Sequence, residues 1–73
     1  MGRQLELGTR VRIKPLADIH QFLHGAAGMV IPPPSEHVMR DRKLVRFDID
    51  VRHPYGGVMR TMWVDETMVE VLS

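Results

Sequence analysis

Two stretches decide the fold, Gly8-Thr-Arg-Val-Arg-Ile-Lys-Pro15 and Gly25-Ala-Ala-Gly-Met-Val-Ile-Pro32. In the first, Val11 and Ile13 alternate with basic residues, which is typical of a strand with one face in the core. In the second, Gly28 is expected to mark a sharp bend or a close approach of two backbones. Both stretches end at a proline, which cannot donate a hydrogen bond to a sheet. Short strands bounded in this way indicate a small, curled β-barrel.

Three further strands are expected in the second half of the chain. On the third strand, Val45, Phe47 and Ile49 alternate with charged residues and are expected to face one way, into the core. The segment from Asp50 to Gly57 contains a His-Pro and a Gly-Gly pair and is expected to connect the third strand to the fourth. The expected strands cover residues 9–14, 27–31, 43–49, 58–64 and 69–71.

Two of the connections are expected to be helical. Leu16, Ile19, Phe22 and Leu23 recur at helical spacing, but the segment is too short for a stable isolated helix. It is therefore predicted to be a long loop with one helical turn that lies over the open end of the barrel. Residues 65–67 are predicted to form a single helical turn before the last strand.

These elements predict one all-β domain. We expect a small SH3-like five-stranded barrel over residues 8–73, with a long first loop and one short helical turn before the last strand. Residues 1–7 are expected to form an N-terminal extension, and residues 35–41 a mixed-charge loop. A length of 73 residues argues against a second domain.

The composition limits the chemistry of the chain. It contains no cysteine, which excludes disulfides, thiolate zinc sites, iron–sulfur ligation and thiol catalysis. A chain this small buries only about 60% of its unfolded surface, so association of copies or docking into a complex is one remedy for the limited core. No apolar run reaches the ~18 residues of a membrane span, and no signal segment is recognisable, so a cytoplasmic protein with no membrane contact is expected.

The charges nearly cancel but are unevenly placed. Ten Lys and Arg residues face nine Asp and Glu residues, for a formal net charge of +1. All the basic residues lie at or before Arg60, whereas Asp65, Glu66 and Glu70 follow it. A nucleic-acid-binding domain usually has a clear basic excess, so this balance gives only weak support to such a partner.

The histidines are the candidate metal ligands. His20 and His24 are four residues apart, a spacing that can place two imidazoles on one helical face, but no third ligand is evident. The alternative is that they are solvated loop residues. His37 and His53 are isolated in the sequence and are expected to be exposed.

No catalytic or cofactor-binding signature is present. The sequence has no Ser-His-Asp grouping, no phosphate-binding glycine loop and no nucleotide fingerprint. Asp48 and Asp50 lie beside Arg46 and Arg52, which suggests a solvated ion network rather than an acid–base pair. We therefore expect a protein that is not an enzyme and holds no cofactor.

Outward-facing basic residues and surplus apolar residues predict a contact surface for a protein partner. Arg10, Arg12 and Lys14 form a basic stripe on the outer side of the first strand. This stripe either steers an acidic partner or only protects a strand edge. Trp, Tyr, Met and Arg are over-represented at the centres of interfaces, and the chain has six methionines. The predicted partner-binding residues are Arg10, Arg12, Arg46, Arg60, Tyr55 and Trp63.

The order of these segments resembles a family. The relevant runs are Gly8-Thr-Arg-Val-Arg-Ile13, Phe22-Leu-His-Gly-Ala-Ala-Gly-Met-Val30, Leu44-Val-Arg-Phe-Asp48 and Val64-Asp-Glu-Thr-Met-Val-Glu-Val-Leu72. Together they resemble the electron-transport accessory group of SH3-like barrels. That group includes the small E subunit of photosystem I, the variable chain of ferredoxin–thioredoxin reductase and the barrel domain of the nitrile hydratase β subunit.

The resemblance implies a non-catalytic accessory or docking module that supports a redox or metal enzyme complex. Its partner would be a larger enzyme subunit or an acidic electron carrier. In nitrile hydratase-like proteins the metal sits in a cysteine cluster of another subunit, which agrees with the absence of cysteine here. A nitrile hydratase β-like accessory or metallochaperone protein is therefore one alternative.

The glycine turn also resembles KOW-type barrels, which bind RNA or polymerase. The resemblance rests on Gly25-x-x-Gly28-x-Val30. In KOW-type barrels basic loops make the contact, whereas the loop here, residues 16–28, offers only Asp18, His20 and His24 as chargeable groups. This departure weakens the case for RNA, but a KOW-like RNA- or DNA-binding barrel stays open as the second alternative. The tiny plasmid-borne dihydrofolate reductases share the expected fold, but their Val-Gln-Ile-Tyr signature is absent.

Overall fold

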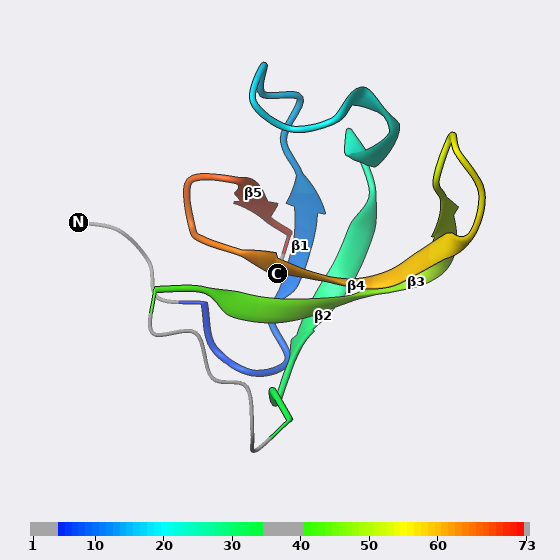
Figure 1. The fold of residues 1–73 in the computed structure, drawn as a ribbon. Coiled ribbons are helices and arrows are strands. Elements are labelled where there is room, and N and C mark those ends of the chain that lie inside the picture. The colour runs from blue at the N-terminus through cyan, green and yellow to red at the C-terminus, as the bar shows by residue number, and fades with distance from the viewer. Residues whose placement is uncertain (1–4, 35–40, 73) are drawn as a thin grey trace.

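The fold is an antiparallel sheet, seen in a computed structural model that describes residues 5–34 and 41–72 (Figure 1). The strand order is β4-β3-β2-β1-β5, so β4 and β5 are the two edges of the sheet and do not pair in the described part of the chain. The all-β prediction is confirmed, with the sheet open between these edges. The strands are β1 (Arg10–Ile13), β2 (Ala27–Ile31), β3 (Lys43–Arg52), β4 (Val58–Val64) and β5 (Val69–Val71).

The sheet curls around a single hydrophobic core. Val11 on β1, Val45 on β3 and Val64 on β4 are all 0% exposed and belong to one cluster, so strands from both sides of the sheet converge on it. Leu5 also lies in this core, although it belongs to the expected N-terminal extension. The other buried members of the cluster are Ile13, Ile19, Leu23, Val30, Phe47 and Val69. Side chains that alternate with these on the strands form what we call the outer face.

Gly28 is the point where two strands lie closest. It pairs with Phe47 across β2 and β3, and a Cβ added to it would lie 2.4 Å from the Arg46 carbonyl oxygen and 2.7 Å from Val45 Cγ1. Both distances are shorter than any real Cβ contact, so only glycine fits this position. The close approach expected at Gly28 is confirmed.

The third strand differs from the prediction. β3 continues to Arg52, and its pairing with β4 shifts between Arg46 and Val51. Val45 and Phe47 face the core as predicted, but Ile49 is 80% exposed. The prediction for Ile49 was wrong because a bulge breaks the two-residue alternation of a strand and turns its side chain outward.

One of the two expected helical turns is present. The 3₁₀ helix η1 (Gln21–Leu23) lies in the long first loop and buries Leu23, as predicted. Residues 65–67 form a turn instead: the Thr67 N–H donates to Asp65 Oδ1 at 2.8 Å, and the Met68 N–H donates to the Asp65 carbonyl at 3.1 Å. An aspartate side chain that satisfies a backbone N–H two residues on favours such a turn over a helix.

Some sequence predictions fall on residues 1–4, 35–40 and 73, which lie outside the described residues. These predictions include most of the expected 35–41 loop and the exposure of His37. In the described part of the chain, no helix has the length and apolar character needed to cross a membrane.

Replacement of Gly28 tests the close approach. Gly28→Ala should lower the free energy of unfolding by about 1–3 kcal/mol, because the new methyl group meets backbone atoms of β3 that cannot rotate away. Met29→Ala is the control, since Met29 is 39% exposed on the outer face and its truncation should cost only about 0.5 kcal/mol. Urea unfolding measures both. Equal losses would contradict the close approach.

The turn at Asp65 predicts a pH dependence. The Thr67 hydroxyl hydrogen bond, with those of the backbone, lowers the pKa of Asp65 below its usual 3.8. A carboxylate with a lowered pKa stabilises the fold fully at pH values above 3.8. This contribution is lost as the pH falls below 3.8 and through the lowered pKa of the folded state. Thr67→Val should therefore cost about 0.5 kcal/mol near neutral pH and progressively less in acid, measured by urea unfolding across pH. A cost that does not change with pH would contradict this assignment.

Candidate functional site

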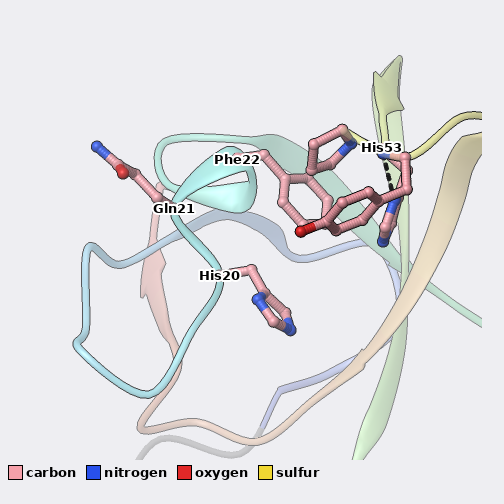
Figure 2. Close-up of a pocket in the computed structure, with 6 residues that line it drawn as sticks. His20, Gln21, Phe22 and His53 are labelled. Carbon is pink, nitrogen blue, oxygen red and sulfur yellow. Dashed lines mark hydrogen bonds between the residues drawn. The ribbon is translucent and has the colours of Figure 1, made fainter.

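An open hollow of about 520 Å³ lies between the long first loop and the turn that joins β3 to β4. Two short segments, far apart in the sequence, contribute all of its lining. In Figure 2 the Phe22 ring points toward His53, whereas the Gln21 side chain points away from the rings. We call this site the aromatic hollow, and its lining residues are His20, Gln21, Phe22, His53, Pro54 and Tyr55.

The rings of the aromatic hollow form a continuous row. The His20 and Phe22 rings stack with centroids 5.6 Å apart and an interplanar angle of 24°. The Phe22 and His53 rings meet edge to face at 5.0 Å, and the His53 and Tyr55 rings lie 5.6 Å apart at 44°. Such offset and edge-on arrangements are the favourable ones for aromatic pairs. The row therefore links the first loop to the β3–β4 turn.

Backbone hydrogen bonds shape the turn that carries Tyr55. The His53 N–H donates to the Gly57 carbonyl at 3.1 Å, and the Gly56 N–H donates to the His53 carbonyl at 3.0 Å. The Tyr55 N–H donates to His53 Nδ1 at 3.1 Å, so Nδ1 is an acceptor and the neutral ring carries its proton on Nε2. This geometry holds the Tyr55 side chain 93% exposed.

His24 holds the other wall in place. Its Nε2 lies 2.9 Å from the Ile19 carbonyl and 3.1 Å from the Leu16 carbonyl. Both neighbours are acceptors, so Nε2 carries a proton and donates to them. The ring thereby ties the long loop together, next to the buried side chain of Leu23 at the end of η1.

The two candidate metal ligands have different surroundings. His20 is exposed and stacks on Phe22 in the aromatic hollow, whereas the Nε2 proton of His24 is engaged by backbone carbonyls. A metal at His24 Nε2 would have to displace that proton and the loop contacts it makes. Within residues 5–34 and 41–72, no group of three or more His, Cys, Asp or Glu side chains is placed to hold a metal ion.

The predicted partner-binding residues fall into two places. Arg10 pairs with Met29, and Met29 with Arg46, so these residues form a row on the outer face. Arg12 is exposed and lies opposite Glu70 on β5. Trp63 lies opposite Leu44 and is half-buried. Tyr55 is separate from this row because it lies in the turn that lines the aromatic hollow.

Two of the predicted arginines have carboxylate partners. Arg10 donates to both carboxylate oxygens of Asp48, with Nη1 2.9 Å from Oδ1. Arg60 Nε lies 3.5 Å from Asp50 Oδ2. The exposed ion pairs expected around these aspartates are therefore present and run between strands, although the arginines that make them are Arg10 and Arg60 and not the neighbours Arg46 and Arg52. Only part of the predicted basic surface remains available for a partner.

Phe22 and His53 were not among the site residues predicted from the sequence. Phe22 was expected to cover the core, which it does in part, since it packs against the core cluster. His53 was expected to be an isolated exposed residue, yet its ring contacts both Phe22 and Tyr55. The available signal was His53-Pro-Tyr55 beside a Gly-Gly pair, which places rings on a tight turn but does not say what they face.

Comparison with known proteins found no match: no family model, no curated protein and no solved structure resembles this chain closely enough to be identified with it. The aromatic hollow and the faces of the sheet are therefore the features that bear on function.

The role of His24 can be tested against that of His20. His24→Ala should lower the free energy of unfolding by about 1 kcal/mol, because it removes the donor that satisfies two carbonyls of the long loop. His20→Ala removes an exposed ring and should cost only about 0.5 kcal/mol. Urea unfolding of both variants measures the difference. A larger loss for His20→Ala would contradict the assignment of His24 as the residue that ties the loop.

Proposed function

We propose that this protein is a non-catalytic docking module that binds a partner protein through the aromatic hollow. The observation that carries the proposal is Tyr55, which is 93% exposed at the end of a row of rings. Exposure of a large ring to water is unfavourable, and burial of a side chain of this size removes about 150–250 Å² of surface from solvent. Tyrosine is also among the residues that contribute most to binding at interface centres.

The strand order supports an SH3-like arrangement for this module. Consecutive strands from β1 to β4 are neighbours, and β5 returns to the free side of β1. A long loop with η1 joins β1 to β2, and a tight turn precedes β5. Five short strands and a long first loop are what the sequence led us to expect of an SH3-like barrel.

The lining of the aromatic hollow favours an uncharged segment of the partner. None of the six lining residues is Lys, Arg, Asp or Glu, and none is a Ser, Thr or Cys nucleophile. A buried charge from the partner would therefore find no Lys, Arg, Asp or Glu to pair with in the hollow, whereas an apolar or ring-bearing segment would pack against the row. The same lining has no Ser or Thr hydroxyl and no Cys thiol beside its histidines, which favours binding over catalysis.

The outer face would orient the partner. The ion pairs among the described residues involve Arg10 and Arg60, whereas Arg12 and Arg46 are exposed on the strands. Exposed bases mainly raise the association rate with an acidic partner and set its orientation. The resemblance to electron-transport accessory barrels suggests a redox or metal enzyme, or an acidic electron carrier, as that partner.

Single-stranded nucleic acid is the second candidate. Exposed rings such as Tyr55 and the His20–Phe22 stack are surfaces on which bases can stack. A strand bound there would also need basic groups for its phosphates, and the lining of the aromatic hollow has none. Protein docking is therefore the function that the site supports better.

Truncation of Tyr55 tests the proposal. Affinity purification from the host should recover a protein that is lost with Tyr55→Ala but kept with Leu7→Ala, since Leu7 is an apolar residue 64% exposed outside the hollow. With that partner purified, Tyr55→Ala should weaken binding at least about tenfold by calorimetry, the loss typical of a central aromatic residue.

Two outcomes would contradict protein docking at the hollow. One is a partner that Tyr55→Ala and Leu7→Ala bind equally well. The other is tight binding of single-stranded RNA that depends on Tyr55 and weakens steeply with salt, because a steep salt dependence reports neutralised phosphates.

A further inference from the structure

The two edges of the sheet are protected to different degrees. β5 has three residues with Glu70 at its centre, and short, charged edges resist pairing with another chain. β4 has seven residues, contains neither proline nor glycine and carries one charged residue, Arg60. That charge is paired with Asp50 on the neighbouring strand. Within residues 5–34 and 41–72, β4 is therefore the edge that is open to a further strand.

The direction of the free backbone groups on β4 follows from the hydrogen bonds of β2. The Val30 N–H donates to the Thr9 carbonyl at 3.0 Å, so the backbone groups of Val30 point toward β1. Directions alternate along a strand, and Val30 pairs with Val45, so the groups of Val45 point away from β2, toward β4. Val45 in turn pairs with Met62, whose groups therefore point back toward β3.

By the same alternation, the N–H and C=O groups of Thr61 and Trp63 point away from the sheet. Their side chains lie on the outer face, where Trp63 pairs with Leu44 and Leu44 with Ile31. Leu44 is 7% exposed although it faces away from the core, so this end of the outer face is apolar up to its edge. An added strand would find both free backbone groups and an apolar surface here.

We propose that β4 pairs antiparallel with β4 of a second copy, so that two sheets join into one across a two-fold axis at Met62. In this register Thr61 of each copy lies opposite Trp63 of the other, and the outward-pointing groups of both residues bond in both copies. The register also places Arg60 opposite Val64 rather than opposite a second Arg60, which avoids a pair of like charges.

The size and composition of the chain favour a second copy as the occupant. The chain has 73 residues and no cysteine, and its buried hydrophobic residues are few, so an extended sheet supplies the stability that a small core lacks. A strand with apolar residues on both faces and one internally paired charge is complementary to itself, as a two-fold interface requires. The dimer is independent of the docking function, and it would present two aromatic hollows.

Sedimentation equilibrium of the full chain tests the proposal. The wild type and Thr61→Val should be dimers, and Thr61→Pro should be a monomer, because proline removes an outward-pointing N–H while the bonds to β3 stay. Circular dichroism establishes that Thr61→Pro keeps its sheet. A monomeric wild type at millimolar concentration, or a folded dimer of Thr61→Pro, would overturn the proposal.

A second measurement covers the case in which Thr61→Pro does not fold. The chain has no cysteine, so a single introduced thiol reports only its own contacts. Opposed residues at a non-hydrogen-bonded pair lie with Cα atoms about 4.5 Å apart, within disulfide range. Met62→Cys should therefore cross-link to a covalent dimer with oxidised glutathione, at least tenfold faster than Met29→Cys on the outer face of β2. Equal rates would overturn the proposed register.

Discussion

The structure depends on the contact between the Gly28 backbone and the backbone of β3. With no side chain at this position, β2 lies against Arg46 and Val45 at a distance that any Cβ would prevent. The sheet can then bend sharply enough to surround a core made of few residues. The side chains of Val11, Val45 and Val64 are completely buried in one cluster, although they come from three strands that do not all pair.

The same curl creates the site. It brings the end of β3 toward the long first loop, and the bulge in β3 adds residues there without adding partners on β4. Figure 1 shows the β3–β4 turn reaching up beside the loop that contains η1. Phe22 and His53 meet at 5.0 Å as a result, and neither loop would hold an aromatic row without the other. The hydrogen bonds of His24 fix the first loop, and those among His53, Gly56 and Gly57 fix the β3–β4 turn.

Two ion pairs join neighbouring parts of the sheet. Asp48 and Asp50 hold arginines of β1 and β4, so these pairs connect strands and reduce the basic surface. Exposed ion pairs of this kind contribute little stability. A partner would find an uncharged aromatic hollow at one end of the sheet and scattered bases on its outer face. The apolar edge at Trp63 is a third, separate surface.

The sequence by itself determined the all-β class, the approximate strands and the need for glycine at position 28, because alternation and stop signals act over a few residues. It also indicated that the first loop contains a helical turn. Only the tertiary structure decided that Ile49 turns outward, that Asp48 pairs with Arg10, and that Phe22 meets His53. Those outcomes depend on a bulge and on the curl of the whole sheet, and contacts between residues so far apart along the chain follow from no local pattern.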